Sequence, residues 1–317
     1  MVERASIMGM PVSVAVRGGD VPAGEVFAWL RWVDATFSTY RPGSEVSRLA
    51  RGELAPAEAH PFVRAVLARC EELRAETGGC FDARAGGTLD PSGLVKGWAV
   101  DRAADLLAAA GAREFCIEAG GDLVARGGPW RVGIRHPRRR NRLAAVLELS
   151  DAAVATSGAY ERGPHIVDPR TGRPATGALS VTVIGPRLAT ADAYATAAFV
   201  MGAAGPEWTL TLPDHAAMTV LDDGRVLSTP GFLRHRRILE VDVHDARRSA
   251  VRRRRRGRRG RRLLGLLPDR EVRGPRAGGR AARAGAGRRE RAPQARRGPG
   301  APPADAAAAP LTQPAQP

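Results

Sequence analysis

The sequence contains few cysteines and no long hydrophobic run. Its 317 residues include three cysteines, Cys70, Cys80 and Cys116, with no Cys-x-x-Cys pair among them. This spacing supports neither a disulfide framework nor a zinc site, so we expect three buried thiols. No apolar run approaches the roughly 18 residues of a membrane-spanning helix, and the N-terminus lacks a basic segment followed by a long apolar one. We therefore expect a cytoplasmic protein without a secretion signal or an N-terminal lipid anchor.

Lysine is almost absent, and the positive charge is concentrated at one end of the chain. Lys96 is the one lysine beside 48 arginines, a bias that looks compositional. Of the formal net charge of +16, residues 251–317 contribute +15, because they hold 19 arginines and four acidic residues. Residues 1–250 are thus almost neutral, and with 44% hydrophobic residues overall the chain can build a sizeable core.

The basic C-terminal stretch lacks helical or strand periodicity apart from a short Leu-Leu-Gly-Leu-Leu run at 263–267. Such a segment buries too little apolar surface to offset the entropy of ordering, so we expect a folded domain over 1–247 and a disordered tail over 248–317. The tail is either a basic arm that contacts nucleic acid or an anionic membrane surface, or a solvated segment without function. Because it contains no aromatic residue to stack on bases, nucleic-acid binding is disfavoured.

Residues 1–247 show a succession of helical and strand patterns. The spacing of apolar residues predicts helices over about 23–37, from Pro61 to about 78, over 97–110 and over 191–202. Strands are predicted at 5–16, 115–118, 122–125, 130–135, 144–149, 152–156 and 180–184, followed by a hairpin of 218–221 and 225–228. Because helices and strands are partly segregated, we expect an α+β domain with a mixed, largely antiparallel sheet and flanking helices.

A glycine-rich segment at 86–97 precedes the third predicted helix and includes Lys96. Free backbone N–H groups and a helix N-terminus favour phosphate binding, to which the lysine adds a charge. The same pattern is also common in loops without a ligand. Neither the dinucleotide-binding Gly-x-Gly-x-x-Gly pattern nor the Walker loop occurs.

Asp192 and Thr196 stand four residues apart at the start of the fourth predicted helix, which we place near Thr190. Residues with this spacing share a helix face, and a carboxylate and a hydroxyl together can hold Mg²⁺. Alternatively, the aspartate stabilises the first turn through the helix dipole and the threonine bonds to a backbone carbonyl. Spacing alone favours this second interpretation.

A polar segment over 156–174 contains Ser157, His165 and a rigid Asp-Pro-x-Thr-Gly-x-Pro turn. Serine and histidine together hint at nucleophilic catalysis, but no Gly-x-Ser-x-Gly elbow supports a hydrolase.

Taken in order, these segments resemble the ApbE-type FAD:protein FMN transferases, which move FMN from FAD onto a hydroxyl of a target protein. The resemblance covers about residues 5–232. It is carried by Met8-Gly9, Phe37-Ser38-Thr39-Tyr40, Ser44-Glu45, Ser47-Arg48-Leu49, Gly79-Cys80-Phe81-Asp82, Asp90 to Asp101, Gly120-Gly121-Asp122, Ser157-Gly158 with Tyr160, His165 to Pro174, Asp192 with Thr196, and Met201-Gly202.

The resemblance implies a site for FAD and a site for Mg²⁺. The residues that it places around FAD are Met8, Tyr40, Cys80, Phe81, Asp82, Asp90, Lys96 and Val167. The implied Mg²⁺ ligands are the Gly93 carbonyl, the Asp192 carboxylate and the Thr196 hydroxyl. Gly120-Gly121-Asp122 can equally be a tight turn between strands, so we do not include it among the expected site residues.

The implied reaction is Mg²⁺-dependent transfer of FMN from FAD to a Thr or Ser hydroxyl of an acceptor protein with an FMN-binding domain, with release of AMP. His165 is our candidate to orient or deprotonate that hydroxyl, because imidazole exchanges protons near neutral pH. Two alternatives remain open: an FAD pyrophosphatase that uses water, and a non-catalytic FAD-binding protein. Members of the family commonly act in the periplasm, so the extracytoplasmic membrane face is a second expected location.

Overall fold

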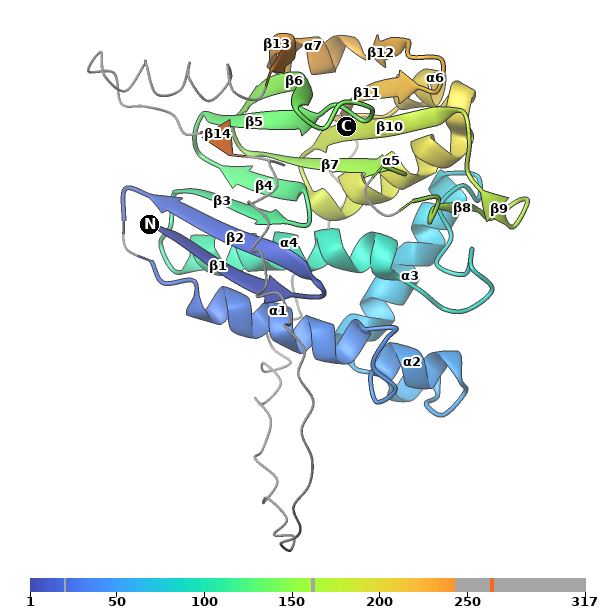
Figure 1. Ribbon diagram of the computed structural model, residues 1–317. Coiled ribbons are helices and arrows are strands. Elements are labelled where there is room, and N and C mark those ends of the chain that lie inside the picture. The colour runs from blue at the N-terminus through green and yellow to red at the C-terminus, as the bar shows by residue number, and fades with distance from the viewer. Residues whose placement is uncertain (20, 161–162, 243–262, 265–317) are drawn as a thin grey trace, which may run out of the picture.

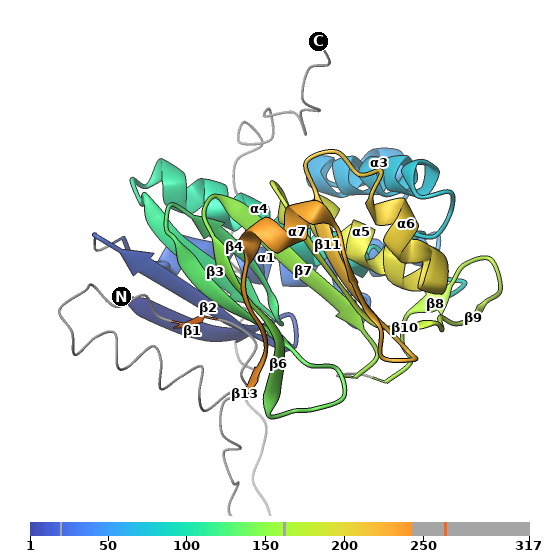
Figure 2. The same ribbon diagram turned by 90° about the horizontal axis from the view of Figure 1, so that it is seen from above.

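The computed structural model describes residues 1–19, 21–160, 163–242 and 263–264, and these form three layers (Figures 1 and 2). The helices are α1 (Gly24–Phe37), α2 (Glu45–Ala50), α3 (Pro61–Glu76), α4 (Ser92–Ala109), α5 (Leu188–Met201), α6 (Gly205–Thr209) and α7 (Pro230–His235). The strands are β1 (Val2–Ile7), β2 (Met10–Arg17), β3 (Glu114–Ala119), β4 (Asp122–Arg126), β5 (Trp130–Arg135), β6 (Arg142–Leu149), β7 (Ala152–Gly158), β8 (Val167–Asp168), β9 (Arg173–Pro174), β10 (Ala178–Gly185), β11 (Ala216–Leu221), β12 (Val226–Ser228), β13 (Arg236–Asp242) and β14 (Leu263–Leu264).

The central layer is an eight-stranded sheet in the order β1-β2-β3-β4-β7-β10-β11-β12. All of its described strand pairs are antiparallel. Helices α1, α4 and α5 cover one face, and a smaller sheet, β13-β6-β5-β14, covers the other (Figure 2). β8 and β9 form a separate hairpin. The expected α+β class with a largely antiparallel sheet is confirmed.

Alternate residues of the central strands enter two different cores. In β2, Val14 and Val16 pack against the helices, whereas Ala15 faces the smaller sheet. In β3, Ile117 belongs to the helical core and Cys116 to the core between the sheets. Since side chains of a strand point alternately to opposite faces, a strand covered on both sides is apolar at nearly every position. This explains the continuous apolar runs in the sequence.

Several expected boundaries were wrong. The single strand expected over 5–16 is a hairpin of β1 and β2, with Met8 and Gly9 in the turn at φ of 54° and 70°. The helix expected from 97 begins at Ser92, so Lys96 lies within α4 and not in the preceding loop. α5 begins at Leu188, two residues before the expected start. Local apolar spacing does not register these ends, because glycine at 93 and 97 weakens the helical pattern that α4 follows.

All three cysteines are buried and unpaired, as expected. Within the described ranges, no helix combines the length and apolar character needed to cross a membrane. The expected tail over 248–317 lies outside the described residues except for Leu263–Leu264, which pair in parallel with β5 at Arg131 and Val132.

Candidate functional site

Three charged side chains meet where α4, α5 and β4 come together. The Lys96 ammonium lies 2.5 Å from Asp122 Oδ2 and 3.3 Å from Asp192 Oδ2. Both carboxylates are almost fully buried, with side-chain exposures of 2% and 6%. The glycine-rich segment and the helix of Asp192, which are distant in sequence, therefore share one site.

A glycine allows α4 and α5 to approach closely at this point. A Cβ added at Gly97 would lie 2.7 Å from the Leu188 carbonyl oxygen and 2.8 Å from Ala189 Cα. The carboxylate of Asp101, one turn further along α4, accepts hydrogen bonds from the N–H groups of Leu188 and Ala189 at 3.0 and 2.9 Å. Asp101 thus caps the N-terminus of α5 from the neighbouring helix and fixes the position of Asp192 one turn later.

Strand β7 brings hydroxyl groups to the same place. Ser157 Oγ lies 3.1 Å from Thr196 Oγ1, and the N–H of Thr156 donates to Asp122 Oδ1 at 2.9 Å. Burial raises the pKa of the Tyr160 phenol, just beyond β7; the charge of Arg135 opposes this shift, and the Asp122 carboxylate adds to it. The site therefore combines carboxylates and hydroxyls from β4, β7 and α5 with the ammonium group of α4.

The charges of this site stabilise one another. Burial alone lowers the pKa of Lys96, but the Asp122 and Asp192 carboxylates outweigh burial and raise that pKa above its ordinary value. Lys96 is therefore a fixed cation at neutral pH.

The donor set is suited to a hard cation. Asp192, Thr196 and Ser157 supply carboxylate and hydroxyl oxygens, which are the ligands that Mg²⁺ prefers. Gly93 precedes Lys96 by three residues in α4, which places it on the same face, one turn closer to the helix N-terminus. The described residues contain no group of three or more His, Cys, Asp or Glu side chains placed to hold a metal ion. A metal here would depend on hydroxyl and carbonyl oxygens in addition to Asp192.

A second group of expected site residues gathers beside α4. The Phe81 ring lies against Gly93, where an added Cβ would be 3.1 Å from the ring edge. Arg170 and Asp168, from the β8–β9 hairpin that also contains Val167, act on the pKa of the Cys80 thiol, which burial raises and Arg170 lowers in part. Cys80, Phe81, Gly93 and the hairpin are therefore neighbours.

Two expected aspartates have structural partners. Asp82 accepts from Arg74 Nε at 3.1 Å and from the Arg84 N–H at 2.7 Å. Asp90 is exposed and accepts from the Ser92 N–H at 3.0 Å, at the start of α4. Met8 lies in the β1–β2 turn, at the same end of the sheet as Asp122, because the Gly120 N–H donates to the Pro11 carbonyl.

Tyr40 and His165 are exposed, and no described contact joins either to the charged site. Tyr40 is 94% exposed in the loop between α1 and α2. His165 Nδ1 lies 2.9 Å from the Gly163 carbonyl oxygen. The placement of these two residues in the active site remains a prediction.

Asp122 is the residue that sequence reasoning missed. Gly120 and Gly121 have φ of 55° and 100° and form the two-residue turn between β3 and β4, so the turn interpretation of this segment is correct. The same turn delivers Asp122 to Lys96. A carboxylate directly after a Gly-Gly turn is the signal that could have drawn attention to it.

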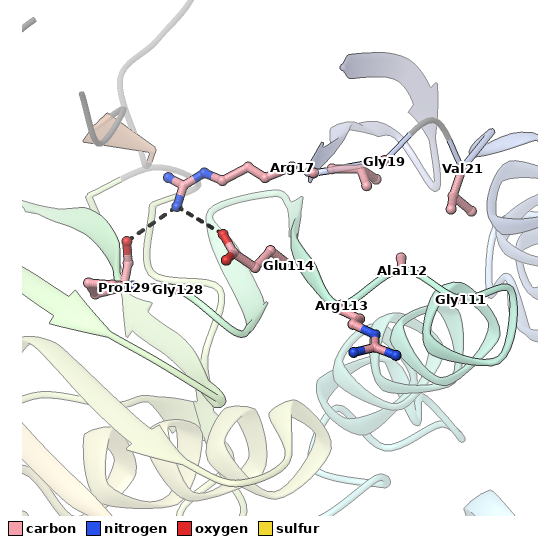
Figure 3. A pocket seen from close by; sticks show the side chains of 11 residues that line it. Arg17, Gly19, Val21, Gly111, Ala112, Arg113, Glu114, Gly128 and Pro129 are labelled. Carbon is pink, nitrogen blue, oxygen red and sulfur yellow. Dashed lines mark hydrogen bonds and ion pairs between the residues drawn. The ribbon is translucent and has the colours of Figure 1, made fainter. Parts of the chain in front are cut away.

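A cavity of about 890 Å³ lies elsewhere, at the other end of β3 (Figure 3). It is lined by Arg17, Glu114 and glycines of the adjoining loops. Arg17 donates to the Pro129 carbonyl at 3.3 Å and lies 4.0 Å from Glu114. None of the residues expected to bind FAD or Mg²⁺ lines this cavity, and of its charged residues, Arg17, Arg113 and Glu114, the first and last already face each other.

Comparisons with known proteins give one family. The sequence model of the ApbE family matches residues 8–88 and 83–219. The chain is 38% identical over 155 residues to the FAD:protein FMN transferase of Rhodobacter capsulatus, covering 45% of this chain and 30% of that one. It is 35% identical over 182 residues to the enzyme of the same name from Treponema pallidum, covering 50% of each. The aligned parts thus span between about a third and half of these relatives.

Solved structures agree on the fold. The apo form of the flavinyl transferase ApbE from Pseudomonas stutzeri superposes with a TM-score of 0.65 at 27% identity, over 74% of this chain and 96% of that one. The ApbE protein of Thermotoga maritima gives a TM-score of 0.67 at 24% identity, over 75% and 99%. Because the family model matches about two thirds of the length of this chain, the chain belongs to the ApbE family.

Proposed function

We propose that the protein transfers the FMN moiety of FAD to a Thr or Ser hydroxyl of an acceptor flavoprotein and releases AMP. The observation that carries this proposal is the contact between Lys96 and Asp192, which unites the glycine-rich segment with the helix of the expected metal ligands. The named activity of the relatives in the ApbE family supports the same reaction.

Asp192, Thr196 and the Gly93 carbonyl would hold Mg²⁺. When bound, the ion would neutralise charge on the pyrophosphate oxygens of FAD. The oxygens of Asp192 and Thr196 are held in place by α5, whose N-terminus Asp101 fixes. Phosphoryl transfer depends mainly on positioning and charge, and this rigid support provides the positioning.

The residues around Cys80 and Phe81 would bind the body of FAD. Tyr40 is exposed and free to stack on an aromatic ring of the cofactor. Phe81 is 3% exposed and packs on Gly93, so it presents at most one edge. Phe81 would therefore shape the wall of the pocket beside the metal ligands.

His165 is suited to receive the proton of the acceptor hydroxyl. A carbonyl oxygen only accepts hydrogen bonds, so the Gly163 carbonyl selects the tautomer with the proton on Nδ1. The lone pair then resides on Nε2. Because the side chain is exposed, an acceptor protein can reach it from solution.

In the transfer step, the acceptor oxygen bonds to the phosphorus on the FMN side of FAD, and the bond from that phosphorus to the bridging oxygen breaks. AMP leaves with the bridging oxygen, and the hydroxyl proton moves to His165 Nε2. No redox partner is needed.

The test is incubation of the full chain with FAD, Mg²⁺ and a flavin-acceptor domain, followed by a denaturing gel viewed for flavin fluorescence. We expect a fluorescent acceptor band that is lost when the acceptor Thr or Ser is replaced by Val or Ala. Release of FMN and AMP without an acceptor would instead identify a pyrophosphatase. FAD binding with neither product would identify a storage protein.

A further inference from the structure

Tyr194 links α5 to the end of α3. It lies two residues after Asp192 and two before Thr196, and at about 100° per residue its ring points to the opposite side of α5 from theirs. There its hydroxyl donates to Glu76 Oε2 at 2.9 Å. Glu76 is the last residue of α3. The hydrogen bond therefore joins the helix of the expected metal ligands to α3, on the side of α5 that faces away from the charged site.

Both side chains of this hydrogen bond are held in place. Arg69, two turns earlier in α3, donates to both carboxylate oxygens of Glu76, at 2.6 and 3.2 Å. The Tyr194 ring packs edge-on against Trp208 and His215, with ring centroids 5.4 and 5.1 Å away. Burial and the hydrogen bond to Glu76 raise the pKa of the Tyr194 phenol to about 12, so the phenol keeps its proton at neutral pH. The link between the two helices is therefore directional and stays formed at neutral pH.

The chain that follows Glu76 leads directly to residues expected to bind FAD. Thr77 Oγ1 donates to the Leu73 carbonyl at 2.8 Å and accepts from the Phe81 N–H at 3.0 Å. The Phe81 ring in turn lies against Gly93 of α4. A shift of the last turn of α3 would therefore displace Phe81 as well.

We propose that Tyr194 is a positioning residue for FAD, which acts through Glu76 to fix how the Cys80–Phe81 segment lies relative to α5. The inference rests on the FAD site of the proposed function and adds a residue from outside the expected ligand sets. A role in the stability of α3 alone predicts that the loss of either carboxylate bound to Arg69 has the same consequence. The proposed role predicts that FAD binding depends on the hydrogen bond between Tyr194 and Glu76.

The experiment is titration of the full chain with FAD in the presence of Mg²⁺, followed by flavin fluorescence. Tyr194→Phe keeps the ring packing and removes the donor, and we expect it to weaken FAD binding by about 3- to 30-fold, as for residues that modulate a site without contacting its ligand. Glu76→Leu should weaken FAD binding by a similar factor. Glu76→Gln keeps an oxygen that accepts from the phenol, so its affinity should stay within about twofold of wild type. The double variant Tyr194→Phe, Glu76→Leu should bind FAD no more weakly than either single variant, because both changes remove one interaction.

Glu72→Leu is the matched control, because Glu72 lies in the same helix and pairs with the same Arg69 at 2.8 Å, whereas the Tyr194 hydroxyl bonds to Glu76. Circular dichroism checks that each variant is folded. The proposal is overturned if Tyr194→Phe binds FAD as tightly as wild type, if Glu76→Gln loses as much affinity as Glu76→Leu, or if Glu72→Leu loses affinity equally. Wild type that binds FAD but transfers no FMN would remove the proposed function alone. Wild type that binds no FAD would remove both.

Discussion

The two ends of the eight-stranded sheet differ in what they enclose. Asp122 follows β3 at one end, where its carboxylate and that of Asp192 are buried beside Lys96. Glu114 begins β3 at the other end and lines a cavity of about 890 Å³. Five residue-to-residue steps along β3 lead from Glu114 to Ala119, a distance of about 17 Å.

The difference shows that the large cavity and the cluster of buried charged side chains lie at separate places in this molecule. At the cavity end, Arg17 lies over the Trp130 ring and beside Glu114, and both side chains are partly exposed to solvent. At the other end, burying carboxylates is unfavourable unless they are compensated, so their presence calls for a functional reason. The charged end is therefore the better candidate for catalysis.

The largest effect is expected from Asp192→Asn. If the charged end binds Mg²⁺, FMN transfer should fall by more than about 100-fold, since even residues outside the ligand set cost about 10- to 100-fold. The amide keeps the size of the side chain, so the fold should survive. Gel fluorescence of the acceptor measures the rate, and circular dichroism measures the fold. FMN transfer at the wild-type rate would show that Asp192 is not a metal ligand.

Gly97→Ala should separate α4 from α5 and disturb the charged end without changing a charge. The added Cβ would meet backbone atoms of Leu188 and Ala189, which cannot move independently of α5. We expect a loss of about 1–3 kcal/mol in the free energy of unfolding, measured by urea denaturation. In an open helix the same change stabilises by about 1 kcal/mol, so the sign is diagnostic.

The matched control for this substitution is Gly86→Ala, at a position where no atom lies within 4 Å of the added Cβ. Its stability should change by less than about 1 kcal/mol. Equal losses in the two variants would show that the close approach of α4 and α5 is unimportant.

Asp101→Asn should lower stability by about 1–2 kcal/mol, because an amide can accept from one of the two N–H groups of α5 but not satisfy both. The size of the loss should depend on pH. Burial raises the pKa of Asp101 above its ordinary value, and Arg187 and the two N–H groups offset this only in part. The folded state therefore keeps a proton that the unfolded state has released.

The free energy of unfolding of wild type exceeds that of Asp101→Asn by an amount that should shrink as pH rises from the ordinary pKa of the carboxyl, in the unfolded state, through its raised pKa in the folded state. Urea denaturation of both proteins at a series of pH values checks the slope. An advantage that grows with pH would mean that the hydrogen bonds and Arg187 dominate over burial.

The smallest effect is expected at the cavity end. Glu114→Gln removes a long ion pair of 4.0 Å whose side chains are 29% and 48% exposed. Such pairs contribute about 0–1 kcal/mol, so stability should change by less than about 0.5 kcal/mol and FMN transfer should not change. A large loss of transfer in this variant would break the contrast between the two ends and direct attention to the cavity.

Sequence reasoning succeeded where the signal was local. The apolar stripe of α1 follows from the period of the helix, and the apolar runs of β3 and β10 are those of strands buried on both faces. It failed at the N-terminal end of α4, and it missed short elements such as α2 and the β8–β9 hairpin. These depend on capping and on contacts with distant segments, for example the bond from the His60 N–H to Glu45 in α2.

The sequence by itself determined the class of the fold and the shared helix face of Asp192 and Thr196, because each follows from residues a few positions apart. Only the tertiary structure decided that Lys96 pairs with carboxylates 26 and 96 residues further along the chain. It also decided that Asp122 is the nearer of the two. The physical reason is that burying charge is favourable only when opposite charges meet, and that meeting is set by the packing of α4, α5, β4 and β7 and not by spacing along the chain.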